Sequence, residues 1–121
     1  KTNDVWSPPK PIEALVKTGE TILRIESPSF SYDGLTIFFA AEIQGGKGGL
    51  DIFKIQLKNA KWTEPQPIGE GINTSADESS PSMTPNNMRL FFTRDSKDPI
   101  EKNETCKEIY CSNFNSLRAC E

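Results

Sequence analysis

The sequence predicts an all-β protein built from antiparallel, four-stranded units that repeat in tandem. Three observations lead to this fold class. The motif W-x-x-P-x-P-I occurs at residues 6–12 and again, with the same pattern, at residues 62–68. Short stretches with the patterns of β-strands fill each repeat, separated by turn residues. No segment shows a convincing helical period, apart from a weak helix candidate at residues 12–16.

Further matches occur in the same order along both copies, as expected for a tandem repeat. Pro28 corresponds to Pro81, 53 residues later. The glutamates that precede these prolines, Glu26 and Glu78, are interpreted as equivalent. Ile37-Phe38-Phe39 corresponds to Leu90-Phe91-Phe92, again 53 residues later. Asp51-Ile52-Phe53 corresponds to Glu108-Ile109-Tyr110, 57 residues later.

The first repeat predicts four strands in order. A short strand ends before Asp33-Gly34, which predicts a turn because glycine tolerates positive φ. Residues 37–41 are consecutively apolar, which is typical of a strand buried on both faces. The glycine-rich residues 44–49 predict a hairpin loop, and the alternation in residues 51–57 predicts the third strand. The prolines in residues 62–68 restrict the fourth strand to a sheet edge.

The second repeat is divergent. Its turn reads Pro85-Asn86-Asn87-Met88, and the polar stretch 96–105 replaces the glycine-rich hairpin. We expect this stretch to form an exposed loop that presents a partner-binding segment with Ser96, Lys97, Asp98 and Lys102. The link of the first repeat carries four extra residues and lacks the Ile-Asn-Thr of residues 72–74.

The composition excludes several classes of function. The 121 residues include no histidine, so no Ser-His or Cys-His nucleophile pair and no histidine-ligated zinc or haem can form within this chain. A net charge of −3, with both signs scattered, gives no reason to expect nucleic acid or an anionic membrane as a partner. The longest apolar run, residues 37–41, is too short to span a bilayer. No signal peptide is recognisable, so any such signal was removed or never present. No cofactor is predicted.

The three cysteines, Cys106, Cys111 and Cys120, do not have the spacing of a zinc site. In an oxidising compartment a Cys106–Cys111 or a Cys111–Cys120 bridge could form, and an odd count leaves one thiol over. The alternative is that the cysteines are small buried apolar residues.

The carboxylates Glu26, Asp51, Asp77 and Glu78 are candidates for a glycosidase pair. Because Glu26 and Glu78 recur with the repeat, a structural role is favoured over catalysis. Asp51 is a weak calcium candidate beside the glycine-rich loop, but a calcium β-roll needs stacked turns, so a flexible hairpin is favoured and no metal site is predicted. Asp33 is expected to bond nearby backbone amides and hold its turn.

The two tryptophans, Trp6 and Trp62, are interpreted as packing residues, again because they recur with the repeat. The alternative is that one exposed tryptophan contacts a sugar. Asn73 and Asn103 begin glycosylation sequons, which would be incidental in a bacterial protein.

Four-stranded sheets in tandem indicate a β-propeller, in which each sheet packs against its neighbours. Two runs resemble the WD40-like PD40 repeat of TolB and of envelope proteins that carry an OmpA-like domain. The first is Pro-Ser-Phe-Ser-Tyr-Asp-Gly-Leu-Thr-Ile-Phe-Phe from Pro28, and the second is Gly-Gly-Lys-Gly-Gly-Leu-Asp-Ile-Phe, which ends at Phe53. The link from Trp62 to Pro81 is similar to versions in Bacteroidetes-type outer-membrane-associated proteins. The residues that carry this repeat signature are Trp6, Pro28, Asp33, Gly34, Phe38, Asp51, Trp62, Glu78, Pro81 and Phe91.

The resemblance implies about two propeller blades. Residues 1–27 would hold the outer strand of a preceding blade and a link, residues 28–68 a complete blade, and residues 69–121 a link and a second, degenerate blade. A closed propeller needs at least about four blades of roughly 40–45 residues, so the propeller is incomplete and other subunits or further blades would cover its open faces.

The resemblance implies a non-enzymatic interaction or scaffold module of a bacterial cell-envelope assembly, periplasmic or associated with the outer membrane. One alternative is an accessory propeller part of a peptidase or glycan-active enzyme whose catalytic residues lie outside this chain. Another alternative is a calcium-dependent adhesion module. No transmembrane segment is expected.

Overall fold

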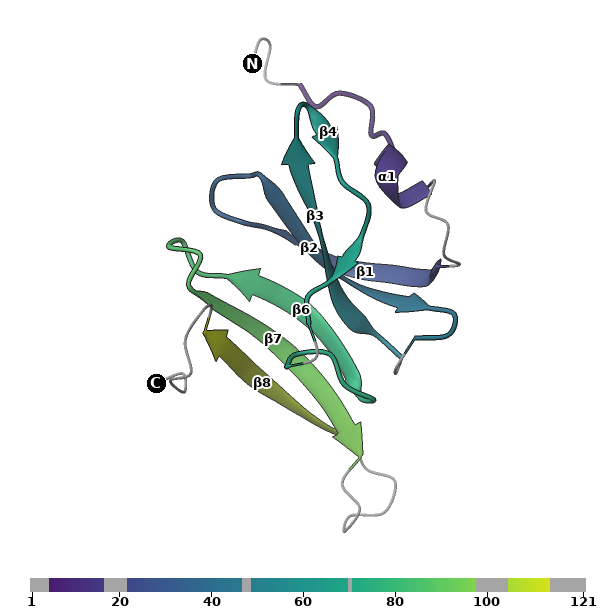
Figure 1. Ribbon diagram of the computed structural model, residues 1–121, viewed down its shortest axis with the longest axis vertical. Coiled ribbons are helices and arrows are strands. Elements are labelled where there is room, and N and C mark those ends of the chain that lie inside the picture. The colour runs from purple at the N-terminus through teal and green to yellow at the C-terminus, as the bar shows by residue number, and fades with distance from the viewer. Residues whose placement is uncertain (1–4, 17–21, 47–48, 70, 98–104, 114–121) are drawn as a thin grey trace.

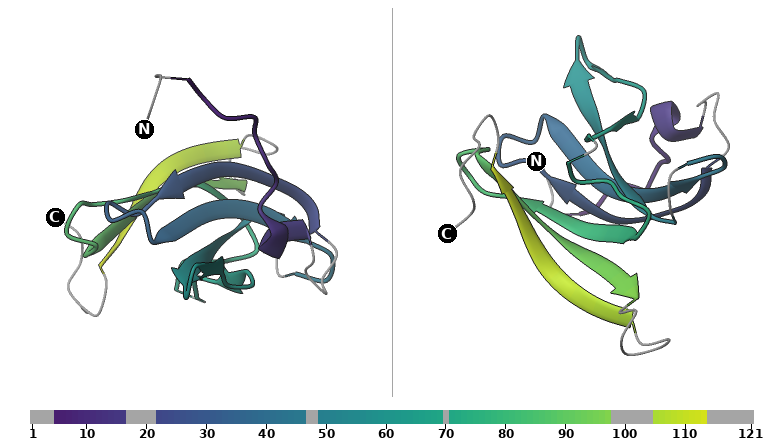
Figure 2. Two further views of the ribbon diagram at one scale, coloured as in Figure 1. Left: turned by 90° about the horizontal axis from the view of Figure 1, so that it is seen from above. Right: turned by 60° about the horizontal axis from the view of Figure 1, so that its bottom comes forward.

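The computed structural model describes residues 5–16, 22–46, 49–69, 71–97 and 105–113, which form an all-β fold of curled antiparallel sheets (Figure 1). The curl makes the sheets a half-barrel, as Figure 2 shows. The one helix in these residues, α1 (Glu13–Val16), is a single turn and coincides with the weak helical pattern. Within the described ranges, no helix has the length and apolar character needed to cross a membrane.

The first sheet has the strand order β1-β2-β3-β4, and β5 also pairs with β3. The register between β2 and β3 runs from Thr36 opposite Gln56 to Ala41 opposite Asp51. Residues 37–41 of β2 are all buried, so the prediction of a strand covered on both faces is confirmed. The strands of this sheet are β1 (Ile22–Phe30), β2 (Thr36–Ile43), β3 (Asp51–Lys58), β4 (Lys61–Trp62) and β5 (Gln66–Pro67).

Two boundaries in the first sheet differ from the prediction. β1 begins at Ile22, so the boundary expected between residues 27 and 28 falls inside a strand. Residues 62–68 form the separate pairings β4 and β5, not one edge strand. Pro65 lies between them, and proline has no N–H to contribute to a continuous ladder.

The second sheet has the order β6-β7-β8, with β6 (Asp77–Met83), β7 (Arg89–Lys97) and β8 (Thr105–Asn113). Ser96 pairs with Cys106 and Lys97 with Thr105, so the loop expected at residues 96–105 is shorter than predicted. Backbone pairing continues because it needs no apolar side chains. Asp98 and Lys102, and the side chains of Ser96 and Lys97, lie outside the described part of the chain.

The two sheets repeat one geometry. β1 and β6 each contain a bulge in front of β2 and β7, and the bulge residues Ser27 and Ser80 have φ of 57° and 51°. The register corrects one prediction, since Glu78 lies opposite Arg94 and therefore corresponds to Ile25, opposite Ala41.

Glu26 lies opposite Ala40 and corresponds to Ser79. The interpretation of Glu26 and Glu78 as equivalent is wrong by one position, because one extra serine separates Glu78 from its proline.

The described residues form two hydrophobic cores, and the first sheet contributes to both. The first core lies on one face of the first sheet, around Phe39 and Phe53, whose rings stack at 6.1 Å, and the segment with Ile12 and Leu15 packs against it. The second core lies between the sheets, where Ile52 of β3 meets Leu90 and Phe92 of β7. The rings of Phe92 and Tyr110 stack at 5.8 Å, which repeats the Phe39–Phe53 pair.

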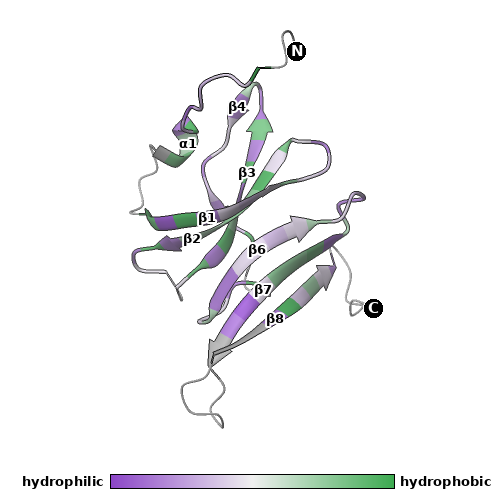
Figure 3. Ribbon diagram, turned by 180° about the vertical axis from the view of Figure 1, so that it is seen from behind, coloured by the Kyte–Doolittle hydropathy of each residue, from purple (hydrophilic) through white to green (hydrophobic). Residues whose placement is uncertain are grey.

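The first sheet carries much of the hydrophobic colour in Figure 3, whereas β6 is mainly hydrophilic. β6 nevertheless packs against β1, β2 and β3. Its polar groups must therefore be bonded there, since burying them without partners is unfavourable.

Candidate functional site

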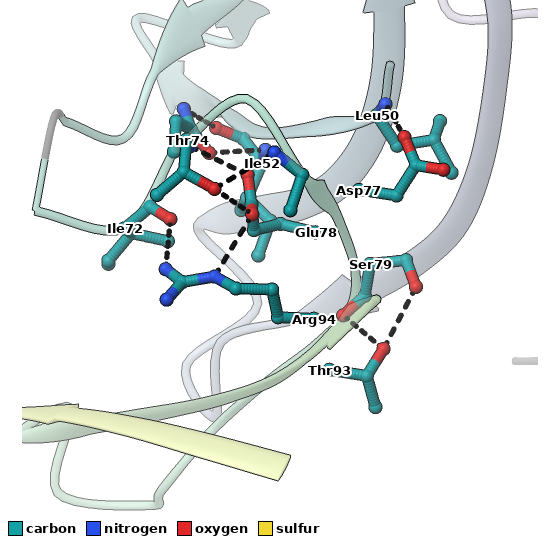
Figure 4. A network of polar contacts seen from close by, with 11 residues as sticks. Leu50, Ile52, Ile72, Thr74, Asp77, Glu78, Ser79, Thr93 and Arg94 are labelled. Carbon is teal, nitrogen blue, oxygen red and sulfur yellow. Dashed lines mark hydrogen bonds and ion pairs between the residues drawn. The ribbon is translucent and has the colours of Figure 1, made fainter. Parts of the chain in front are cut away.

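A polar clamp ties the two sheets together. We define it as Asn73, Thr74, Asp77, Glu78 and Arg94, which come from the link after β5 and from β6 and β7. Figure 4 shows Thr74, Glu78 and Arg94 converging near Ile52, with Asp77 reaching Leu50 to one side.

Asn73 extends the edge of β3 with its side chain. The backbone N–H of Ile52 donates to Asn73 Oδ1 at 2.7 Å, and Asn73 Nδ2 donates to the carbonyl of Ile52 at 3.0 Å. The N–H of Ile68 donates to the same carbonyl at 3.0 Å. Because the amide of Asn73 is buried and bonded on both sides, the geometry supports the interpretation of its sequon as incidental.

Glu78 is fully buried, and its carboxylate accepts three hydrogen bonds. It accepts the N–H of Thr74 at 2.9 Å, the Thr74 hydroxyl at 2.7 Å and Arg94 Nε at 3.1 Å. Arg94 also donates to the carbonyl of Ile72 at 2.7 Å, and its guanidinium lies 4.4 Å from the ring centre of Tyr110. A carboxylate enclosed in this way suits structure better than glycoside hydrolysis, which needs a carboxyl group exposed to substrate.

Asp77 ties the start of β3 to β6. The N–H of Leu50 donates to Asp77 Oδ1 at 2.7 Å, and the N–H of Glu78 donates to the carbonyl of Leu50 at 2.8 Å. Gly49 lies directly against the Asp77 carboxylate, where an added Cβ would collide with it. The approach of these two backbones therefore requires glycine at position 49.

The turn between β1 and β2 is held as predicted. The Ser31 hydroxyl donates to Asp33 Oδ1 at 2.6 Å, and the N–H of Leu35 donates to the same oxygen at 2.9 Å. These two bonds, that from Ser31 first, hold the pKa of Asp33 below its ordinary value. Gly34 has φ of 75°, as the Asp-Gly pair predicts.

The turn between β6 and β7 forms the same bonds with different residues. The Thr84 hydroxyl donates to Asn86 Oδ1 at 2.7 Å, and the N–H of Met88 donates to that oxygen at 3.0 Å. Asn87, in the place of Gly34, has φ of 60°. The divergent residues thus conserve the conformation, since asparagine also tolerates the left-handed region.

A cleft of about 550 Å³ opens between the sheets. Its lining includes the apolar side chains of Phe38, Met83 and Leu90, together with the polar residues Lys54 and Asp33. Asp33 is the one carboxylate among the described lining residues, and the turn already engages it.

The weak calcium candidate Asp51 is the first residue of β3 and is buried opposite Ala41. Within the described ranges, no three His, Cys, Asp or Glu side chains gather in a way that could hold a metal ion.

The two tryptophans occupy different surroundings. Trp62 packs against the first core, and its ring lies 6.4 Å from that of Phe30, which agrees with a packing role. Trp6 is 96% exposed, so the prediction that it packs is wrong in this structure. The segment around Trp6 forms no strand, whereas β4 fixes Trp62 against β3.

The second sheet leaves an apolar surface open. We define the outer face as Phe91, Thr93 and Ile109, on the side of β7 and β8 away from the second core. Ile109 is 76% exposed, whereas its repeat counterpart Ile52 is fully buried. Phe91 is 38% exposed, whereas its counterpart Phe38 is buried. Two positions that are buried in the first unit are thus exposed in the second.

Cys111 is disulfide-bonded, so the interpretation of all the cysteines as small buried apolar residues is wrong for this one. Cys111 lies five positions after Cys106 in the extended β8, a distance of roughly 16 Å between Cα atoms. A disulfide allows at most about 7 Å, so this strand excludes the Cys106–Cys111 bridge. The other bridge considered involves Cys120, which lies outside the described residues.

Sequence reasoning missed Asn73 and Arg94 as structural groups. The signal for Arg94 was its position, two residues after Phe92 on the buried side of β7. A cation on an apolar face predicts a buried anion opposite, here Glu78.

No family model matches the chain, and comparison with curated proteins and with solved structures found no match either.

Proposed function

We propose that this chain is a non-enzymatic interaction module of a bacterial cell-envelope assembly, built from TolB-like PD40 β-propeller blades. In this proposal β1–β5 form one blade and β6–β8 form most of the next. The sheets act as a rigid support, and the exposed surface binds a protein partner.

The agreement between the two units supports blades. They share the bulge at Ser27 and Ser80, the turn bonds of Asp33 and Asn86, and the stacked ring pair in each sheet. Matching details at three separate places favour two copies of one unit packed face to face, which is how propeller blades are arranged.

The single observation that carries the proposed function is the open outer face. An exposed apolar surface on a rigid sheet is the ordinary mark of a protein-binding site. Here the first unit supplies a reference for it, since the same positions in that unit, Phe38 and Ile52, are buried, and Ile52 packs against the second sheet.

The disulfide at Cys111 supports the envelope location. Disulfides persist in oxidising compartments such as the bacterial periplasm and are rare in the cytosol.

Site-specific photocrosslinking tests the proposal. A photoreactive phenylalanine analogue replaces Ile109 on the outer face of the full chain, and the control carries it at Tyr32, an exposed turn residue. We expect a discrete crosslinked protein from position 109 in envelope fractions of the source organism, absent from position 32. That protein is identified, purified and shown to bind the chain directly.

The absence of any crosslinked protein at position 109, or equal crosslinking at position 32, would overturn the interaction function. Hydrolysis of peptides or glycans by the purified chain would contradict its non-enzymatic character.

A further inference from the structure

We propose that the cleft between the two sheets binds a small aliphatic carboxylate, whose charge pairs with Lys54. This site is separate from the outer face and from the protein partner proposed for that surface. Three features of the cleft lead to this class of ligand. They are a cation that no described residue engages, the apolar side chains beside it, and a volume of about 550 Å³, which is in the range of small-molecule sites.

The cleft lies between the sheets, next to the second core. It extends to the turn between β1 and β2 and to the turn between β6 and β7, which lie at the same end of the molecule (Figure 1 and Figure 3). Lys54 stands opposite Phe38 on the face of β3 and β2 that also carries Ile52. Leu90 of β7 lies on the facing wall. Strands inside the chain form both walls, so the cleft is defined without the residues that follow β8.

Lys54 and Arg94 are cations on the facing sides of the two sheets. Neither recurs in the other unit, since the counterpart of Lys54 is Cys111 and that of Arg94 is Ala41. Glu78 accounts for Arg94, with which it pairs at 3.1 Å. No hydrogen bond or ion pair engages the Lys54 ammonium within the described part of the chain. The contacts of the fold therefore explain one cation and leave the other available to a ligand.

The position of Lys54 favours the binding of an anion. Lys54 is half-buried in the wall of the cleft, where apolar side chains partly shield it from water. Its attraction for an anion is therefore stronger than at an open surface. Lys58, farther along β3, is exposed and outside the described lining, and solvent screens its charge. The same type of cation thus has different surroundings at two positions of one strand.

The charge of the lining indicates a ligand with one negative charge. Lys54 is the one cation among the described lining residues, and a carboxylate carries one charge at neutral pH. A phosphate monoester carries nearly two charges and suits a site with several cationic donors. The side-chain amide of Gln56, on the same face of β3, is a second donor for the carboxylate. Asp33, the one carboxylate in the described lining, already accepts bonds from Ser31 and Leu35 in its turn.

The rest of the lining suits an aliphatic chain. Phe38 and Leu90 are buried, and Ile68, Ile72 and Met83 pack around the second core while remaining partly exposed. An aliphatic chain placed among these side chains buries apolar surface on both partners. Methionine is flexible, so Met83 can adjust to the shape of the chain. The cleft thus combines one charged group with an apolar wall, which matches the chemistry of an aliphatic carboxylate.

Titration of the full chain with octanoate, followed through its amide NMR shifts, tests the inference. We expect saturable shifts at Lys54 and Leu90, with a dissociation constant of about 1 mM or tighter. The amide of Ile109, on the outer face, should not shift. Octanamide has the same chain without the charge and should bind at least about tenfold more weakly.

Variants of Lys54 test its role directly. Lys54→Met removes the charge but keeps an apolar stem, so it should weaken octanoate binding at least about tenfold and abolish the preference over octanamide. Lys54→Arg keeps the charge and should bind octanoate within about threefold of the unaltered chain. Lys58→Met, at the exposed position on β3, is the matched control and should bind as the unaltered chain does. Unchanged melting temperatures show that the variants fold.

Four results would overturn the inference. They are shifts that do not saturate by about 10 mM octanoate, shifts that map to the outer face, equal affinity for octanoate and octanamide, and unchanged octanoate binding by Lys54→Met. The comparison with octanamide uses the unaltered chain, so it decides the role of charge even if a variant fails to fold. Tighter binding of octyl phosphate than of octanoate would contradict the assignment of a carboxylate. The crosslinking experiment at position 109 tests the proposed function independently of all these results.

Discussion

Arg94 and Arg24 form ion pairs of nearly equal length in opposite surroundings. Arg94 Nε lies 3.1 Å from the fully buried Glu78, whereas Arg24 Nε lies 3.0 Å from Glu42 on the exposed side of the first sheet. We predict that Arg94→Ala lowers the free energy of unfolding by about 3–5 kcal/mol, because it leaves a buried carboxylate without its cation. Arg24→Ala should lower it by about 0–1 kcal/mol, since solvent screens the exposed pair.

Urea unfolding of both variants measures this difference. Equal losses for Arg94→Ala and Arg24→Ala would contradict the role assigned to the clamp.

Asp33 gives the turn between β1 and β2 a pH dependence that its counterpart lacks. The pKa of Asp33 is lowered by the Ser31 and Leu35 bonds, so its contribution to stability is present above the ordinary value of 3.8 and is lost as the pH falls through the lowered pKa. Asp33→Asn keeps the accepting oxygen, as Asn86 shows in the second turn, but removes the titration.

We therefore predict that the unfolding free energy of Asp33→Asn falls less than that of the unaltered chain between neutral pH and pH values below 3.8. Urea unfolding across this range measures the unfolding free energies of both proteins. The contributions of the other carboxylates are the same in both and cancel in the difference. The converse change, Asn86→Asp, should steepen the decline, and parallel curves for all three proteins would refute the prediction.

At the scale of elements, Asn73 takes the place of a strand at the edge of β3. We predict that Asn73→Ala lowers the free energy of unfolding by about 2 kcal/mol, since two buried hydrogen bonds to Ile52 are lost. Exchange of the Ile52 amide with solvent should accelerate at least about tenfold. Gln66→Ala serves as the control, since Gln66 is an exposed β5 residue that pairs through its backbone. A similar acceleration of Ile52 amide exchange in the Gln66→Ala variant would contradict the role assigned to Asn73.

The sequence predicted the elements better than their ends. Alternation and consecutive apolar residues placed β2 and β3, because those patterns follow directly from burial on one face or on both. The ends of β1, β7 and β8 were missed because polar residues such as Ser96 continue a ladder through backbone bonds alone. The equivalence of Glu26 and Glu78 was wrong because one extra serine separates Glu78 from its proline, whereas the bulge itself lies at matching positions in both strands.

At the scale of the whole molecule, the internal repeat predicted two similar units but not how they are joined. The joint depends on Asn73 reaching the backbone of Ile52 and on Asp77 reaching the backbone of Leu50, contacts between residues 21 and 27 positions apart. Such contacts depend on the angle at which the sheets meet, which no local pattern encodes. The exposure of Trp6 was missed for the same reason, because a packing role requires a neighbouring sheet that the motif alone does not supply.

The clamp has a geometric consequence for the proposed propeller. By fixing Ile52 of β3 to the link, and Leu50 just before β3 to β6, it sets the rotation that carries the first sheet onto the second. In a closed propeller the same rotation recurs from each blade to the next, so a deviation of a few degrees at every step is multiplied around the circle. The geometry of one small buried cluster would thereby determine how many blades complete the propeller.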